Sequence, residues 1–125
     1  MQRLIYESAW DKTIAAQDRK MIEEIFNETL EENGQNVAFP LVRSALNHKG
    51  DLLVTCLIHN FGSEPFSIED TELTYKEDGA LIAEMAFTTP QVQLPPQTSM
   101  PWTFIFPKSS IQKESVHTGG KLDFK

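Results

Sequence analysis

The single cysteine and the three histidines are the side chains best suited to nucleophilic or metal chemistry, but their spacing supports neither. Cys56 lies in the apolar run 52–58, where a buried and unreactive thiol is expected. His59 is the nearest base, yet successive strand residues point to opposite faces, so it would lie across the strand from Cys56. His48 and His117 form no zinc-like spacing with either residue. We therefore expect no catalytic cysteine, no metal and no other cofactor.

Carboxylates are numerous, but none is marked out by its sequence setting for acid–base catalysis. Such catalysis needs two carboxyl groups that face each other in a cleft, one of them with a raised pKa. The acidic residues gather instead in the stretches 23–32 and 69–72, where solvated polar faces explain them. Gly119 and Gly120 precede only a short C-terminal stretch, so they form no phosphate-binding loop ahead of a helix. We therefore expect that the protein is not an enzyme.

Length, composition and charge indicate one acidic globular domain. The chain has 125 residues, of which 40% are apolar, enough to build a substantial core in a single domain, residues 1–125. With 11 basic and 18 acidic residues the formal charge is -7, which disfavours binding to nucleic acid and to anionic lipid. No apolar stretch reaches the roughly 18 residues that span a membrane, and the N-terminus has no apolar signal region. We expect no integral membrane segment and a cytoplasmic location, with peripheral association with a membrane left open.

One segment has the period of an amphipathic helix, residues 17–32. Its apolar residues recur at spacings of three and four: Ile22, Ile25, Phe26, Thr29 and Leu30. Asp18 is the expected N-cap, because its carboxylate can accept from free N–H groups of the first turn. Gly34 is expected to end the helix in a left-handed conformation. The preceding segment, residues 10–14, is predicted to be a turn or loop, so we expect one helix in all.

From about residue 36 to residue 125 the period changes to two, which is typical of strands. The expected strands cover residues 37–46, 52–60, 66–75, 80–88 and 102–106, with short edge strands in 2–8 and 122–124. Pro40 indicates an edge position or a bulge, a kink is expected at residues 69–70, and Asp78 with Gly79 predicts a tight hairpin turn. Residues 90–98 are predicted to be a Pro-rich connection. Strands without crossover helices predict a mostly β fold, an antiparallel immunoglobulin-like β-sandwich with one N-terminal helix against an edge or outer face.

The aromatic residues divide into core candidates and surface candidates. The alternating residues Trp102, Phe104 and Phe106 are expected to fill one face of a sheet. Trp10, Phe61 and Phe87 are less constrained and can lie at a surface used for binding. We predict a protein-contact surface formed by Trp10, Phe61, Pro95 and Pro96. A strand left unpaired at a sheet edge can also accept a partner strand.

Three segments of the chain resemble the SLAP domain of Bacillus and its relatives. They are AWDKTI at residues 9–14 with the helix start at 18–26, GDLLVTCLIHN at 50–60, and LPPQTSMPWTFIFP at 94–107. The likeness runs from about residue 4 to residue 111. The family takes its name from an S-layer assembly protein that works with an accessory Sec system and carries the domain in duplicate. The resemblance therefore implies a role in secretion or assembly of surface-layer proteins through protein–protein contact, and it carries over no functional residue.

Three functions follow from these observations, in order of preference. The first is a non-catalytic protein-binding module that assists accessory Sec-dependent secretion or S-layer assembly, with secretion machinery or a surface-layer precursor as its partner. The second is a homo-oligomeric structural or stress-related domain whose edge strands pair with themselves. The third is a small-molecule binder with a pocket between helix and sheet.

Overall fold

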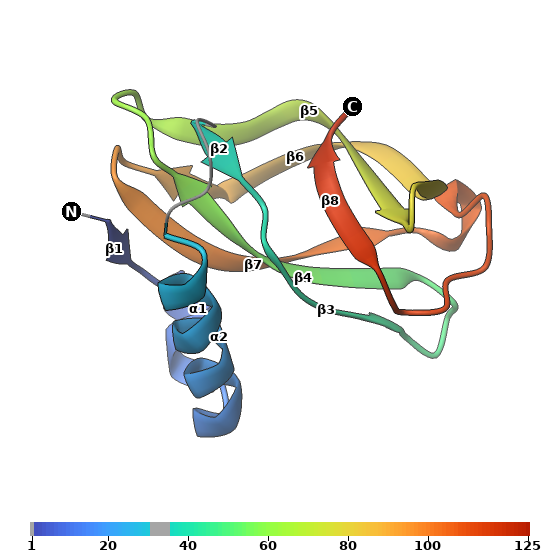
Figure 1. Ribbon diagram of the computed structural model, residues 1–125, viewed down its shortest axis with the longest axis horizontal. Coiled ribbons are helices and arrows are strands. Elements are labelled where there is room, and N and C mark those ends of the chain that lie inside the picture. Colours follow the sequence, from blue (N-terminus) through green and yellow to red (C-terminus); the bar gives the residue numbers. More distant parts are fainter. Residues whose placement is uncertain (1, 31–35) are drawn as a thin grey trace.

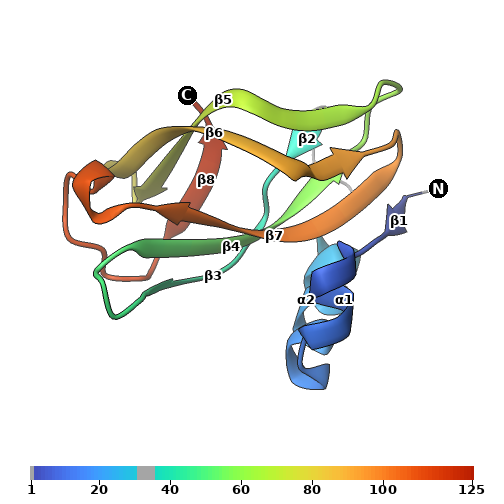
Figure 2. The same ribbon diagram turned by 180° about the vertical axis from the view of Figure 1, so that it is seen from behind.

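The computed structural model describes residues 2–30 and 36–125, whose strands form two sheets packed face to face (Figures 1 and 2). The helices are α1 (Ser8–Thr13), α2 (Ala16–Glu28) and the 3-10 turn η1 (Lys108–Ser110). The strands are β1 (Arg3–Leu4), β2 (Val37–Ala38), β3 (Leu41–Leu46), β4 (Leu52–Asn60), β5 (Phe66–Glu77), β6 (Ala80–Leu94), β7 (Thr98–Phe106) and β8 (Gly120–Phe124). One sheet has the order β1-β7-β4-β2, with β3 also paired to β4, and the other has the order β6-β5-β8. The predicted mostly β sandwich is confirmed.

Strand β4 lies at the centre of the first sheet, as its apolar sequence predicts. Four alternate residues face the second sheet and are buried in the core: Leu52, Val54, Cys56 and Ile58. The residues between them face the other side, where Leu57 and His59 are also fully buried. A strand covered on both faces reads as a continuous apolar run, which explains why this segment was the clearest strand in the sequence.

The turns and irregularities of the strands follow the local residues. Asp78 and Gly79 form the β5–β6 hairpin turn with φ angles of 49° and 84°, which confirms the predicted hairpin. The expected kink in β5 is also confirmed, because Asp70 has a φ of 44° and the pairing with β6 shifts beside it. Pro40 interrupts the strand expected at 37–46, so that β2 and β3 pair separately with β4.

The predicted connection at residues 90–98 is wrong, because β6 continues to Leu94. Pro90 is accommodated in a bulge of β6: Thr89 and Gln93 pair with consecutive residues of β5, so the residues between them leave the ladder. A proline in a bulge removes no ladder hydrogen bond. The true connection to β7 is only residues 95–97. The predicted antiparallel sandwich carries one short parallel pairing, between β1 and β7.

Two α-helices lie between β1 and β2, where one helix was expected. The segment predicted to be a turn or loop at residues 10–14 begins inside α1. The Glu7 carboxylate caps this helix by accepting from the backbone N–H groups of Ala9 at 2.8 Å and Trp10 at 3.3 Å. The Thr13 hydroxyl donates to the Ala9 carbonyl at 2.8 Å. A helix of six residues is too short to show an apolar period, and these side-chain bonds are what hold it.

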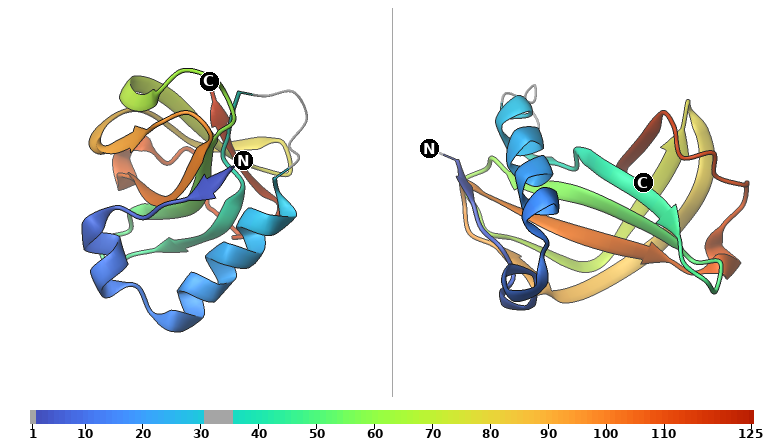
Figure 3. Two further views of the ribbon diagram at one scale, coloured as in Figure 1. Left: turned by 90° about the vertical axis from the view of Figure 1, so that its left-hand side faces the viewer. Right: turned by 90° about the horizontal axis from the view of Figure 1, so that it is seen from below.

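Helix α2 lies across the outer face of the first sheet (Figure 3). Its predicted apolar stripe faces the sheet, and Ile22 is 2% exposed. The predicted N-cap is wrong, because the helix begins one turn earlier and its N-cap is Ala15, with no side-chain cap. Asp18 instead pairs with Arg43 of β3 at 3.3 Å. The predicted C-terminal end is also wrong, because α2 ends at Glu28 with Thr29 as its C-cap. Gly34, the residue expected to end the helix, lies outside the described residues.

Replacing Gly120 with alanine is expected to destabilise the fold. A Cβ at this position would lie 2.5 Å from Tyr75 Oη and 2.8 Å from Leu41 Cδ2, where β8 and β3 approach each other. Overpacking at such a contact typically costs about 2 kcal/mol. Urea unfolding of Gly120→Ala should show this loss, with the exposed Thr118→Ala as the matched control. Equal midpoints for the two variants would contradict the close packing inferred here.

Candidate functional site

A shallow groove of about 310 Å³ follows the seam where the edges of β6 and β7 meet. Strand β6 is the edge of the second sheet, and β7 is the edge of the first sheet beyond its short pairing with β1. The residues that line the groove come from both strands and include Met85, Phe87, Thr88, Trp102, Thr103 and Ile105. None of the lining residues is charged, although 23% of the residues in the chain are charged.

The groove has an apolar floor and partly exposed apolar rims. Phe87 and Phe104 form the floor and are 8% and 1% exposed, with ring centroids 5.1 Å apart. Met85 and Ile105 stand at the rims and are 37% and 50% exposed. An apolar, uncharged and concave surface of this kind is suited to contact with a polypeptide.

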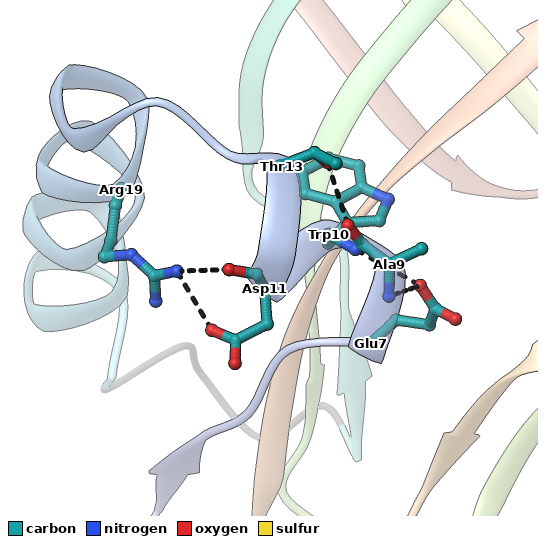
Figure 4. Close-up of polar contacts among 6 residues, drawn as sticks. All are labelled: Glu7, Ala9, Trp10, Asp11, Thr13 and Arg19. Atoms are coloured by element: carbon teal, nitrogen blue, oxygen red, sulfur yellow. Dashed lines mark hydrogen bonds and ion pairs between the residues drawn. The ribbon is translucent and has the colours of Figure 1, made fainter.

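Trp10 of α1 lies against the β7 side of this groove. Its ring stacks on Trp102 with centroids 6.3 Å apart and planes inclined by 26°. The helix is held in place by Arg19 of α2, which donates to the Asp11 carboxylate at 2.9 Å and to the Asp11 carbonyl at 3.2 Å (Figure 4). The Glu7 and Thr13 bonds described above complete this arrangement (Figure 4). Trp10 therefore joins α1 to the edge of the first sheet.

Replacing Trp10 with alanine is expected to loosen α1 from the sheet and to expose Trp102. Truncating a half-buried tryptophan should lower the free energy of unfolding by about 2 kcal/mol, less than for a fully buried ring. Acrylamide quenching of the remaining tryptophan, Trp102, should become more efficient. Lys12→Ala, an exposed change in the same helix, is the matched control. If Trp10→Ala unfolded at the same urea concentration as the unmodified chain and Trp102 stayed shielded from acrylamide, the stack would not be what holds α1.

The structure brings three of the four predicted contact residues together and places the fourth elsewhere. Phe61 lies in the β4–β5 loop, and the Gln97 side chain donates to its carbonyl at 2.6 Å. That bond ties Phe61 to the short loop containing Pro95 and Pro96, of which Pro95 is exposed and Pro96 half-buried. Trp10 instead contacts β7 at Trp102. A protein-contact role for these four residues stays a prediction.

A buried polar chain centred on His59 joins α2 and the N-terminal segment to the sandwich. The Gln2 amide donates to Ser99 Oγ at 3.0 Å, and the Ser99 hydroxyl donates to His59 Nδ1. The Nε2–H group of His59 donates to Thr29 Oγ1 at 2.7 Å. The Thr29 hydroxyl in turn donates to the Ile25 carbonyl at 2.7 Å. The imidazole is 0% exposed, and burial lowers the pKa of His59 from 6.5 to about 4. His59 is therefore a neutral structural residue.

A second polar cluster surrounds Glu77 and holds the loop that precedes β8. The Glu77 carboxylate accepts from the hydroxyls of Tyr75 and Ser115 at 2.8 and 2.6 Å. It also accepts from the backbone N–H groups of Val116 and His117 at 2.8 and 3.1 Å. Burial by itself raises the pKa of Glu77, but these donors outweigh it and leave the pKa below its usual value. The carboxylate is thus used to fix a loop.

The single thiol also has a structural position. Cys56 is fully buried in the core, and burial raises the pKa of its thiol well above the usual value. Within residues 2–30 and 36–125, no group of three His, Cys, Asp or Glu side chains is arranged to hold a metal ion. Over the same residues, no helix has both the length and the apolar character needed to cross a membrane.

A family model described as the SLAP domain matches residues 4–123, nearly the whole chain. The chain belongs to the SLAP domain family. No curated protein and no solved structure matches it significantly.

Of the segments that resemble SLAP domains in sequence, one lines the seam groove and the other two contact its β7 wall in this SLAP domain. Residues 9–14 contain Trp10 of α1, and residues 94–107 contain all of β7, which forms one wall of the groove. Residues 50–60 contain β4, the central neighbour of β7. Sequence reasoning pointed to unpaired sheet edges in general, but it did not find β6 as the other wall. Only the order of strands in the two sheets brings Met85 and Phe87 beside β7.

Proposed function

We propose that this SLAP domain is a non-catalytic protein-binding module that assists accessory Sec-dependent secretion or assembly of surface-layer proteins. Membership of the family supports the association with that system. The observation that carries the binding role is the uncharged groove between β6 and β7, which leaves Met85 and Ile105 partly exposed. In a chain with a formal charge of -7, such a surface is consistent with contact to another polypeptide.

The side chains with catalytic potential support a non-catalytic role, because the fold itself uses them. Cys56 packs in the core, His59 bonds to hydroxyls on both ring nitrogens, and Glu77 accepts from four donors. The proposal places the module on the cytoplasmic side of the membrane, where it contacts secretion machinery or a surface-layer precursor.

Affinity capture tests this proposal. The immobilised full chain is exposed to a native lysate of the source organism, and the retained proteins are identified by mass spectrometry. We expect a component of the secretion machinery or a surface-layer precursor to be enriched. The Met85→Lys variant, which places a charge in the groove, should lose this enrichment, and Val116→Lys, at an exposed site in the loop before β8, should keep it. Enrichment of neither class of protein by the unmodified chain would refute the proposal.

A further inference from the structure

The backbone of β7 directs hydrogen-bonding groups toward its outer edge at every second residue. The carbonyls of Gln97 and Ser99 accept bonds from the β1 segment at 3.0 and 2.8 Å. The pairing of β7 with β4 on its other side is in register over all 9 residues. Because the N–H and C=O of a strand residue point to the same side, Pro101, Thr103 and Ile105 continue the edge that β1 occupies.

This edge is unpaired beyond Ser99. β1 ends at Leu4, and no other strand among the described residues pairs with β7 on this side. Pro101 has no N–H to donate, which explains why a proline is accommodated on this side of the strand. Thr103 and Ile105 each offer an N–H and a C=O to an incoming strand. The edge also borders the groove, so alternate side chains of an added strand would reach its apolar floor.

We propose that the β7 edge at Thr103 and Ile105 binds an extended segment of a partner polypeptide by strand addition, with uncharged side chains at the centre of the segment and basic side chains next to them. The inference rests on the proposed function and specifies the surface and the chemistry of the partner. Backbone bonds to Thr103 and Ile105 supply affinity, and side chains that enter the groove beside Phe87 supply selectivity. β1 already shows that this edge accepts an added strand.

The charges around the groove favour a basic segment over a second copy of this chain. Glu69 and Asp70 are exposed at the β5 kink, and the Asp70 N–H donates to Thr88 Oγ1 in the groove at 2.9 Å. In the described part of the chain neither carboxylate forms an ion pair, whereas Asp11, near the Trp10 side, is paired with Arg19. Pairing two copies would bring acidic rims and two charges of -7 together. A segment with basic ends is instead attracted to the same rim.

Tryptophan fluorescence gives a direct test, because both tryptophans of the chain, Trp10 and Trp102, lie at this edge. The probe is a short capped peptide in which Val alternates with Thr and Lys stands at both ends. We expect a saturable change in emission that weakens as salt is added. The same peptide with Glu at both ends should bind at least about tenfold more weakly. No saturable change with the Lys peptide would overturn the proposal.

A matched pair of variants isolates the backbone contact. Thr103→Pro removes an N–H that faces the edge, and Thr103→Val keeps this N–H. Both lose the hydroxyl contact between Thr103 and Thr55 at 2.8 Å. Losing a backbone bond should weaken the peptide about tenfold in Thr103→Pro, with Thr103→Val close to the unmodified chain. Equal affinities for the two variants would overturn strand addition at this edge.

A second pair of variants tests the binding surface without depending on correct folding of Thr103→Pro. Met85→Lys adds a positive charge to the groove, and Val116→Lys adds one in the loop before β8. Only Met85→Lys should weaken the Lys peptide, and an equal effect of both would overturn the placement in the groove. Sedimentation of the free chain over a concentration series should show a monomer. A dimer that Thr103→Pro disrupts would assign the edge to a second copy and overturn the choice of partner.

Failure of this inference and failure of the proposed function are distinguishable. If Thr103→Pro still captures a secretion component or a surface-layer precursor from lysate, the proposed function stands and the β7 edge is not its binding surface. If the Lys peptide binds as expected but the unmodified chain captures neither class of protein, the β7 edge stands as a peptide-binding surface and its assignment to secretion fails.

Discussion

Acidification is expected to lower the free energy of unfolding by about 3 kcal/mol through His59 alone. Burial lowers the pKa of this imidazole from 6.5 to about 4 in the folded protein. As the pH falls through 6.5, the unfolded chain gains a proton at His59 and the folded chain does not. The stabilisation is therefore complete above pH 6.5 and is lost progressively down to about pH 4. The groups in contact with the ring carry no opposite charge, since they are the hydroxyls of Thr29 and Ser99 and the rings of Phe26 and Phe61.

Urea unfolding followed by circular dichroism across this pH range measures the effect. His59→Gln provides the matched variant, because its amide stays neutral and can still bond to a hydroxyl. We expect His59→Gln to be less stable than the unmodified chain at neutral pH and to show a flatter dependence between pH 6.5 and pH 4. The exposed histidines, His48 and His117, are present in both proteins and cancel from the comparison. Parallel pH curves for the two proteins would rule out His59 as the source.

Removal of the Glu77 carboxylate is expected to have an effect of similar size. Glu77→Ala removes the acceptor shared by four donors: the hydroxyls of Tyr75 and Ser115 and the N–H groups of Val116 and His117. Bonds to a charged acceptor are worth more than neutral ones, and of these donors only the Tyr75 hydroxyl belongs to a buried residue. We expect a loss of about 3 kcal/mol in urea unfolding.

Hydrogen exchange separates this effect from general destabilisation. In Glu77→Ala the amide protons of Val116 and His117 should exchange faster than in the unmodified chain. The amide protons of β4, a strand that the variant leaves in place, should show a smaller change. Glu114→Ala, an exposed change in the same loop, is the control and should leave both amides protected. Glu77→Gln, which keeps one acceptor oxygen, should fall between the control and Glu77→Ala. If Glu77→Ala behaved like Glu114→Ala, the carboxylate would not be what holds the loop.

The architecture was predictable where a residue pattern acts locally. The apolar run from Leu52 to Asn60 predicted a strand covered on both faces, and β4 is such a strand. Asp78 and Gly79 predicted the hairpin because few residues adopt positive φ angles at low cost. The stripe containing Ile22 predicted a helix that packs on a sheet, as α2 does. Each of these patterns is decided by residues close together in the sequence.

The groove and the polar clusters were not predictable because they depend on which strands become neighbours. His59 bonds to Ser99, 40 residues away, and Ser99 bonds to Gln2, 97 residues away. The signal available in the sequence was a histidine within the most apolar run of the chain, which required partners for its two nitrogens. Their identity followed only from the pairing of β4 with β7, which places Ser99 beside His59, and from the packing of α2 on the sheet, which places Thr29 there. For the same reason, Met85 could not be assigned to a groove shared with β7.

The pairing of β1 with β7 also sets an order of events during synthesis of the chain. A ribosome makes β1, α1 and α2 first, but the strand that receives β1 and Trp10 comes almost a whole chain length later. Such distant contacts form slowly, because a long loop must close before they contribute any stability. β1 and Trp10 must therefore wait until β7 has emerged and paired with β4, whereas the partners of α2, β3 and β4, emerge earlier. Over that interval the nascent chain exposes a surface that the finished protein conceals.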